Sequence, residues 1–336
     1  MTSTVTVDTS DLAPVSFPQD VPTIDLPKVS LSKLASRDAA ETARVTTIMR
    51  TSSFFMLDLM DHPSGVLLYE SIVECARLAG KLFTSIPFEK KQTFQRRKNV
   101  AILDKGALGT CDENGLYRKL FSQGYEIARL VLEAFQTALQ VEDDAILQSH
   151  DLNSPSGHTI RMLRYPAATA HKTQGRPTLA AHRDWTSLTI LFTWLGGLQV
   201  PKSTAKWYEG SPQSEDDWAY VRPVPGCACI NAGEALQLLT GKMVKAGLHR
   251  VVAAPGDQEK CDKLSVFIGI RPKNEWPMRP YRSPLIPDSV AEDEDYANLT
   301  CEEWGGISIA KWIAAAQARE RAKLAEGQAN RKTGSA

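Results

Sequence analysis

The sequence has no excess of charge of either sign. Lysine and arginine together number 39, and aspartate and glutamate also number 39, so the formal net charge is zero. Such a chain has no global electrostatic field to attract nucleic acid or an anionic membrane, and no basic run interleaved with aromatic residues suggests a polymer track. We therefore expect a small-molecule substrate, with no nucleic acid and no membrane as partner.

Long apolar runs and paired cysteines are also missing. No stretch is long and apolar enough to span a bilayer, and the first twenty residues contain Asp8 and Asp11 instead of the basic start and apolar centre of a signal peptide. The six cysteines are scattered, without a Cys-x-x-Cys pair. We therefore expect reduced cysteines and a cytoplasmic protein.

Helical periodicity dominates the first half of the chain. Apolar residues recur three and four positions apart from Leu68 to Leu82 and again over 121–140, which predicts two long helices with one buried stripe each. Shorter helices are expected at 37–49 and 304–324. The polar stretch 95–115 predicts a mobile loop near the mouth of a site.

From Thr159 the pattern changes to short β-type runs broken by glycine and proline. The expected strands are 159–165, 187–194, 198–201, 218–222, 226–231, 248–252 and 264–270. This density of short strands predicts a sandwich or barrel.

The two halves are expected to form one unit, because the helices would leave apolar faces bare unless they packed on the β half. We expect this unit to span 18–325. Its parts are a helix-rich region (18–157), a β core (158–290) and a C-terminal helical region (291–325), between flexible tails at 1–17 and 326–336.

His182 and Asp184 stand at the entrance of an apolar, β-branched run. Alternate side chains of an extended chain point the same way, so we expect this pair to converge while Arg183 and Trp185 face outward. His249 is the candidate for the third ligand of a metal, and its short β run would have to lie beside the first one in the folded sheet. Two histidines and one carboxylate form the facial triad of non-haem Fe(II) oxygenases. A zinc hydrolase with the same ligands is an alternative.

Several motifs share one order along residues 160–272. They are His182-Arg183-Asp184, His249-Arg250-Val251 and Lys263-Leu264-Ser265, with further similarity in 161–166, 196–200 and 231–234. In these motifs the chain resembles the iron- and 2-oxoglutarate-dependent dioxygenases of the isopenicillin-N-synthase-like family. The resemblance implies a mainly β fold with helices, a double-stranded β-helix or jelly-roll core, which uses Fe(II), 2-oxoglutarate and O2.

In that family an arginine and a serine hold the far carboxylate of 2-oxoglutarate. Lys263 stands where the arginine is expected, and it shares a strand face with Ser265, so a cation and a hydroxyl can still converge on one carboxylate. Tyr165 is expected to donate a third hydrogen bond. If Lys263 is only a solvated lysine at a strand end, the enzyme would use 2-oxoglutarate poorly, or would be an oxidase that takes its electrons from the substrate.

The resemblance also implies a reaction. Decarboxylation of 2-oxoglutarate to succinate would accompany hydroxylation, desaturation or ring rearrangement of a small organic, secondary metabolite. Arg161 and Trp185 are the candidate substrate contacts. In the competing interpretation, Arg183 is an outward cation and Trp185 a packed aromatic. A non-catalytic binding protein of the same fold is a further alternative. His62, His150, His158 and His171 lie in polar turn contexts, where a surface role is expected.

Overall fold

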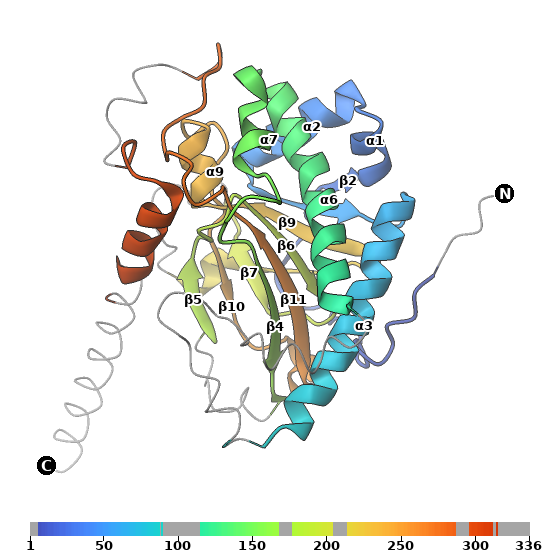
Figure 1. Cartoon of the computed structure of the whole chain (residues 1–336). Coiled ribbons are helices and arrows are strands. Elements are labelled where there is room, and N and C mark those ends of the chain that lie inside the picture. The colour runs from blue at the N-terminus through green and yellow to red at the C-terminus, as the bar shows by residue number, and fades with distance from the viewer. Residues whose placement is uncertain are drawn as a thin grey trace, which may run out of the picture.

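Two β-sheets form the centre of the computed structural model, and helices cover the outer face of one of them (Figure 1). The structure describes residues 6–87, 89, 115–167, 177–203, 214–286, 296–311 and 314. Most neighbouring strands run antiparallel, whereas β1 with β8 and β2 with β3 are parallel. Two mixed sheets of short strands, with helices on one side, form the jelly-roll arrangement that was predicted.

The six-stranded sheet has the order β2 (Lys28–Ser30), β3 (Phe54–Asp58), β9 (Cys227–Ala232), β6 (Leu188–Thr193), β11 (Lys263–Ile270) and β4 (Thr159–Tyr165). The five-stranded sheet has the order β1 (Thr23–Ile24), β8 (Trp218–Val221), β7 (Leu198–Pro201), β10 (His249–Val251) and β5 (Leu179–His182).

Two long helices, α3 (Pro63–Ser85) and α6 (Leu116–Ala138), pack on the six-stranded sheet (Figure 1). His62 begins α3 as its N-cap, with Nδ1 accepting a hydrogen bond from the backbone N–H of Ser64 at 3.3 Å. The shorter helices are α1 (Leu31–Ala35), α2 (Ala39–Thr51), α7 (Ala145–Ser149) and α9 (Glu234–Leu239), and the 3-10 turns are η1 (Glu142–Asp144), η3 (Glu215–Asp217) and η4 (Gly256–Lys260).

The two faces of strand β11 lie in different environments, the main core and the space between the sheets. Val266, Ile268 and Ile270 point into the main core, which also contains apolar residues of α3 and α6. Lys263 and Ser265 lie on the opposite face, between the sheets, because side chains alternate along a strand. A smaller apolar cluster also fills this inner space: Phe54, Met56, Leu198, Val200, Val221, Cys227 and Cys229. The inner face of β11 therefore brings polar side chains into the space between the sheets.

Most predicted elements are present. Strands 159–165 and 198–201 have the predicted bounds, the helix expected at 121–140 begins earlier, at Leu116, and the C-terminal helix begins at 301 instead of 304. The predicted loop at 95–114, the end of the C-terminal helix beyond 314 and the tail at 326–336 lie outside the described residues. Within the described part of the chain, no helix has the length and apolar character to cross a bilayer.

The N-terminal segment departs from the expected loose tail of residues 1–17. Residues 6–17 lie on the body of the protein, with Leu12 only 7% exposed. Arg77 of α3 holds Asp11 through two hydrogen bonds, of 2.9 Å from Nε and 2.7 Å from Nη2. The prediction of a tail is wrong for this segment, because one buried leucine and one bidentate ion pair attach it.

Candidate metal centre

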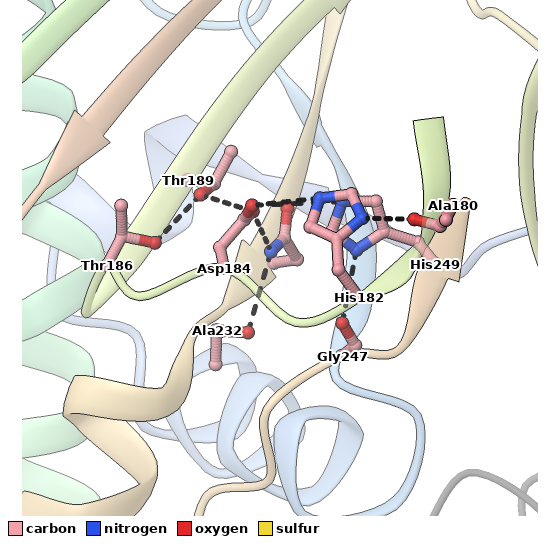
Figure 2. A network of polar contacts seen from close by, with 9 residues as sticks. Ala180, His182, Asp184, Thr186, Thr189, Ala232, Gly247 and His249 are labelled. Atoms are coloured by element: carbon pink, nitrogen blue, oxygen red, sulfur yellow. Dashed lines mark hydrogen bonds and ion pairs between the residues drawn. The ribbon is translucent and has the colours of Figure 1, made fainter. Parts of the chain in front are cut away.

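His182, Asp184 and His249 point toward one another between the two sheets (Figure 2). Strands β5 and β10 are antiparallel neighbours, and His182 and His249 are direct Cα partners, as predicted for the two histidine-bearing strands. Asp184 Oδ1 lies 3.6 Å from His182 Nε2 and 3.8 Å from His249 Nε2. The three potential ligand atoms all lie within 4.8 Å of one another.

Asp184 does not lie on a strand. β5 ends at His182 and β6 begins at Leu188, and the two strands belong to different sheets. The expectation that one continuous extended chain would align His182 with Asp184 is therefore wrong. The turn that carries the chain between the sheets brings the carboxylate to the histidines instead.

Gly233 fixes this turn. A Cβ atom at Gly233 would lie 2.1 Å from the backbone oxygen of Thr186 and 2.6 Å from that of Asp184, which no side chain permits. The close approach allows the backbone N–H of Glu234 to donate to the backbone oxygen of Asp184 at 2.7 Å. The first residue of α9 therefore holds the turn in place through this hydrogen bond.

Both histidines present Nε2 to the centre. Nδ1 of His182 lies 2.8 Å from the backbone oxygen of Ala180, and Nδ1 of His249 lies 3.1 Å from that of Gly247 (Figure 2). A carbonyl can only accept, so each Nδ1 carries the proton and donates it. The lone pair of each Nε2 is then available to a metal, in the arrangement that orients metal-binding histidines.

Two donors that the sequence did not reveal hold the other oxygen of Asp184. Thr189 Oγ1 donates to Asp184 Oδ2 at 2.8 Å, and Asn231 Nδ2 donates to the same atom at 2.9 Å (Figure 2). Thr189 and Asn231 are Cα partners on β6 and β9. The signal for them was a polar residue within each of two largely apolar strands. Because both donors bind Oδ2, Oδ1 is left for a metal.

The protonation states also suit a metal. Burial alone would raise the pKa of Asp184, but His249, His182 and Asn231 outweigh it and hold the pKa well below its usual range. Burial lowers the pKa of His249 to about 4. Burial also opposes charge on His182, yet the hydrogen bond and charge of Asp184 leave its pKa raised. The carboxylate is therefore ionised and His249 is neutral, the forms that bind metals.

The spacing of the donors fits a first-row metal. Metal–ligand bonds of about 2.1 Å place neighbouring donors of an octahedral site roughly 3 Å apart. Asp184 Oδ1 is 3.6 and 3.8 Å from the two Nε2 atoms, so a closure of less than about 1 Å completes the site.

A second polar subsite lies on the inner faces of β11 and β4. Lys263 is 5% exposed, and its Nζ lies 5.1 Å from the centre of the Tyr165 ring, its partner across the strand pair. Ser265, on the same face, is 4% exposed and donates to Thr193 Oγ1 at 3.3 Å. The interpretation of Lys263 as a solvated lysine at a strand end is therefore wrong.

The ammonium of Lys263 has no carboxylate partner among the residues that the structure describes, and burial alone lowers its pKa to about 8. A buried cation without an anion is costly. The subsite therefore favours an anionic ligand, whose carboxylate would offset the cost of burial.

Comparisons with known proteins agree with this geometry. Residues 157–272 match the 2OG-Fe(II) oxygenase superfamily. A 2-oxoglutarate-dependent dioxygenase of Aspergillus fumigatus is 35% identical over an alignment that covers 94% of both chains. The chain belongs to the 2OG-Fe(II) oxygenase superfamily. It is thus an oxidoreductase that uses Fe(II) and 2-oxoglutarate and acts on small molecules.

Solved structures show the same fold for this oxygenase. A full-length Neurospora crassa protein in complex with alpha-KG has a TM-score of 0.64 at 17% identity, over 89% of this chain and 99% of that one. JOX2 in complex with 2OG, Fe and JA has a TM-score of 0.62 at 17% identity, over 90% of both chains.

The residues flanking the metal ligands differ from expectation. Arg183 and Trp185 were expected to face outward, but both are half-buried. Trp185 packs against the main core, and Arg183 donates from Nε to the backbone oxygen of Ala246 at 3.3 Å. Arg161, on the inner face of β4, is exposed, with its guanidinium carbon 5.6 Å from the centre of the Phe267 ring.

His150 is not the surface residue that its polar sequence context indicated. It is 1% exposed, and burial lowers its pKa to about 4. Its Nε2 is 2.7 Å from Ser187 Oγ, and its Nδ1 is 2.7 Å from the backbone oxygen of Ile146. A neutral histidine therefore joins α7 to the end of the turn that carries Asp184. His158 is also mostly buried, and burial lowers its pKa to about 3. His171 lies outside the described residues.

Proposed function

We propose that His182, Asp184 and His249 bind Fe(II), and that Lys263, with Ser265 and Tyr165, binds the far carboxylate of 2-oxoglutarate. The substrate would be a small organic, secondary metabolite, and the enzyme would work in the cytoplasm. The observation that carries the proposal is the convergence of two imidazole Nε2 atoms and one carboxylate oxygen within 4.8 Å, in a chain of this family.

When bound, iron, 2-oxoglutarate and O2 would supply the oxidising chemistry: O2 would oxidise 2-oxoglutarate to succinate and carbon dioxide and, with its second oxygen atom, a C–H bond of the substrate. The residues of the chain hold the candidate metal ligands in the required orientation and protonation state. Asp184 stays ionised because Thr189 and Asn231 donate to it. The two histidines keep their Nε2 atoms turned to the centre, because each Nδ1 is held by a backbone oxygen. The apolar inner cluster excludes water from the space between the sheets.

Lysine in place of arginine changes how the co-substrate is held. An ammonium is a compact point charge, so it neutralises a carboxylate without the planar, two-point registration of a guanidinium. Orientation must then come from neighbouring donors. Ser265 shares the strand face of Lys263, and Tyr165 stands opposite Lys263 on β4, which supports a three-point contact.

Arg161 and Trp185 are the proposed substrate contacts. Arg161, Leu163 and Tyr165 are alternate residues of β4, so Arg161 lies on the same inner face as Tyr165. Trp185 follows Asp184 in the sequence. A small substrate is consistent with the neutral charge of the chain and with JOX2, whose structure contains JA. The type of oxidation, whether hydroxylation, desaturation or ring rearrangement, depends on which substrate carbon these contacts place near the iron.

The test is metal and co-substrate binding by His182→Ala and Lys263→Ala. His182→Ala should abolish stoichiometric Fe(II) binding. Lys263→Ala should leave Fe(II) binding unchanged and lower the affinity for 2-oxoglutarate about 100-fold, because a charge-assisted contact in a buried site is lost. His62→Asn, which retains a capping side chain far from the site, is the matched control.

Oxygen dependence separates the alternatives. Succinate should form from 2-oxoglutarate only with Fe(II) and O2. Hydrolysis with Zn²⁺ in the absence of O2 would favour a zinc hydrolase, and O2 consumption without any need for 2-oxoglutarate would favour an oxidase. Equal 2-oxoglutarate affinity in Lys263→Ala and the parent would remove Lys263 from the site.

A further inference from the structure

The Lys263 subsite rests on the segment between β6 and β7, residues 194–197, called here the β6–β7 connection. A Cβ atom at Gly197 would lie 2.8 Å from Lys263 Nζ, so the ammonium lies directly against the backbone of this glycine. Ser265 reaches the same connection through Thr193. It donates to Thr193 Oγ1 at 3.3 Å, and that hydroxyl donates to a backbone oxygen of the connection at 2.9 Å. The cation and the hydroxyl of the subsite therefore share one support.

The β6–β7 connection ends in two adjacent glycines, Gly196 and Gly197. Glycine has more backbone freedom than any other residue, and Gly197 has a φ of +114°, which residues with a side chain rarely adopt. A lysine ammonium is, in addition, a compact charge on a flexible stem. Contacts from outside the connection are therefore needed to fix the position of the charge.

Gln258 supplies such a contact. Its side chain is 2% exposed, and its Oε1 accepts a hydrogen bond from the backbone N–H of Gly196 at 2.9 Å. Its Nε2 donates to the backbone oxygen of Val15 at 2.9 Å. One buried amide thus ties the β6–β7 connection to the N-terminal segment, and it belongs to η4, which leads into β11 at Lys263.

The N-terminal segment packs on the outer side of the same connection. A Cβ atom at Gly196 would lie 2.8 Å from Phe17 Cε2 and 2.6 Å from Pro255 Cδ. The Phe17 ring is itself held in place, since the guanidinium carbon of Arg222 lies 4.8 Å from its centre and the Tyr220 ring meets it edge-on at 6.4 Å. The connection is therefore enclosed, with the ammonium on one side and these contacts on the other.

Building on the proposed function, we propose that Gln258 is a positioning residue for 2-oxoglutarate. It acts through the β6–β7 connection to fix the distance between the Lys263 ammonium and the metal ligands, and this distance sets the chain length of the 2-oxo acid that binds. 2-Oxoadipate is one methylene longer than 2-oxoglutarate, so its far carboxylate fits a fixed ammonium poorly. An ammonium that is free to move accommodates both acids.

The experiment measures the affinity of both acids by titration calorimetry, with the full chain loaded with Fe(II) in the absence of O2. The parent should bind 2-oxoglutarate at least about 10-fold tighter than 2-oxoadipate, the range for one misplaced methylene. Gln258→Met keeps the side-chain length and removes both hydrogen bonds. It should bind 2-oxoglutarate about 3- to 10-fold more weakly, the range for one ordinary hydrogen bond, and lose most of the preference over 2-oxoadipate.

Gln136→Met is the matched control. Gln136 is also a buried glutamine that joins two backbone groups, the oxygen of Val141 and the N–H of Ile146, but it lies in α6. This variant should lose stability and keep the affinity and the preference of the parent. Phe17→Ala should reduce the preference in the same direction as Gln258→Met, and it carries the test if Gln258→Met does not fold.

A double variant shows whether Gln258 acts through Lys263. In a Lys263→Met background, Gln258→Met should cause no further loss of 2-oxoglutarate affinity, because the charge that it positions is gone. A general loosening of the fold would lower the affinity by the same factor in both backgrounds.

Four outcomes overturn the proposal. They are a parent that binds both acids equally, an unchanged preference in the Gln258→Met or Phe17→Ala protein that folds, the same loss of preference in Gln136→Met, and full additivity with Lys263→Met. Failure of the proposed function gives a different result, since Lys263→Met alone would then bind 2-oxoglutarate as the parent does. If Lys263→Met binds weakly and Gln258→Met does not, only the positioning role fails.

Discussion

Replacing Lys263 by methionine should make the unliganded protein more stable and should weaken the binding of 2-oxoglutarate. The amine is 5% exposed, and its pKa is lowered from 10.5 to about 8 by burial. At about 1.4 kcal/mol for each pKa unit, the folded state carries a cost of about 3 kcal/mol for keeping this group charged at pH 7. Methionine has a similar length and no charge to bury.

The net gain is smaller than the full cost. Lys263→Met also removes the contact between the ammonium and the Tyr165 ring, which is worth about 0.5–2 kcal/mol. We therefore expect the free energy of unfolding to rise by about 1–2 kcal/mol at pH 7. The assay is urea unfolding of parent and variant without iron or 2-oxoglutarate, followed by tryptophan fluorescence.

The pH dependence has a definite sign. The folded pKa of Lys263 lies below the unfolded value, so the cost is fully present below pH 8 and disappears as the pH rises toward 10.5. The parent should therefore gain stability relative to Lys263→Met across this window. 2-Oxoglutarate should bind the variant about 100-fold more weakly at pH 7, because its carboxylate no longer meets a cation.

Lys273→Met is the matched control. Lys273 also lies over an aromatic ring, 5.2 Å from the centre of Trp276, but its side chain is 23% exposed and 3.6 Å from Glu275. This variant should be no more stable than the parent. A Lys263→Met protein that is less stable than the parent at pH 7, with a difference that does not change up to pH 10, would falsify the burial argument.

Four further substitutions test the surroundings of the site. Asn231→Ala and Thr189→Val each remove one donor to Asp184 and should weaken Fe(II) about 10- to 100-fold in a metal titration, with the fold intact by circular dichroism. Gly197→Ala forces a Cβ to within 2.7 Å of a backbone oxygen at a φ of +114°; urea unfolding should show a loss of more than about 1 kcal/mol of unfolding free energy. His150→Phe removes a buried hydrogen-bonding ring and should cost about 2–4 kcal/mol of unfolding free energy, and an unchanged urea midpoint would contradict the role of the network.

Strand positions in the six-stranded sheet were predictable because its strands have one face in the helix-covered core and one between the sheets. In the strand at 159–165 the residue pattern alone predicted the observed bounds. The pairing of the two histidine-bearing strands was also expected, since a third ligand had to lie beside the first. The fold and the clustering of His182, Asp184 and His249 could thus be predicted from residue type, order and spacing.

Features that depend on long-range packing could not be predicted from the sequence. His150 follows a serine and precedes an aspartate, a polar context that indicates the surface, yet its side chain is buried and contacts Ser187, which is distant in the sequence. Leu12 follows the polar residues Asp8 to Asp11, and only the packing of the folded chain shows that it joins the main core. Local pattern does not report which neighbours the fold will supply.

The position of Asp184 also depends on long-range packing, because the residues around it come from both sheets. His182 and His249 come from the five-stranded sheet, whereas the donors to Asp184, Thr189 and Asn231, come from the six-stranded sheet. The ligand set exists only when the two sheets are docked. Because a metal that binds only the folded state stabilises it by RT ln(1 + [metal]/Kd), Fe(II) should resist separation of the sheets as well as local disorder of the turn. On the proposed ligand assignment, a bound metal would therefore link the two halves of the jelly roll.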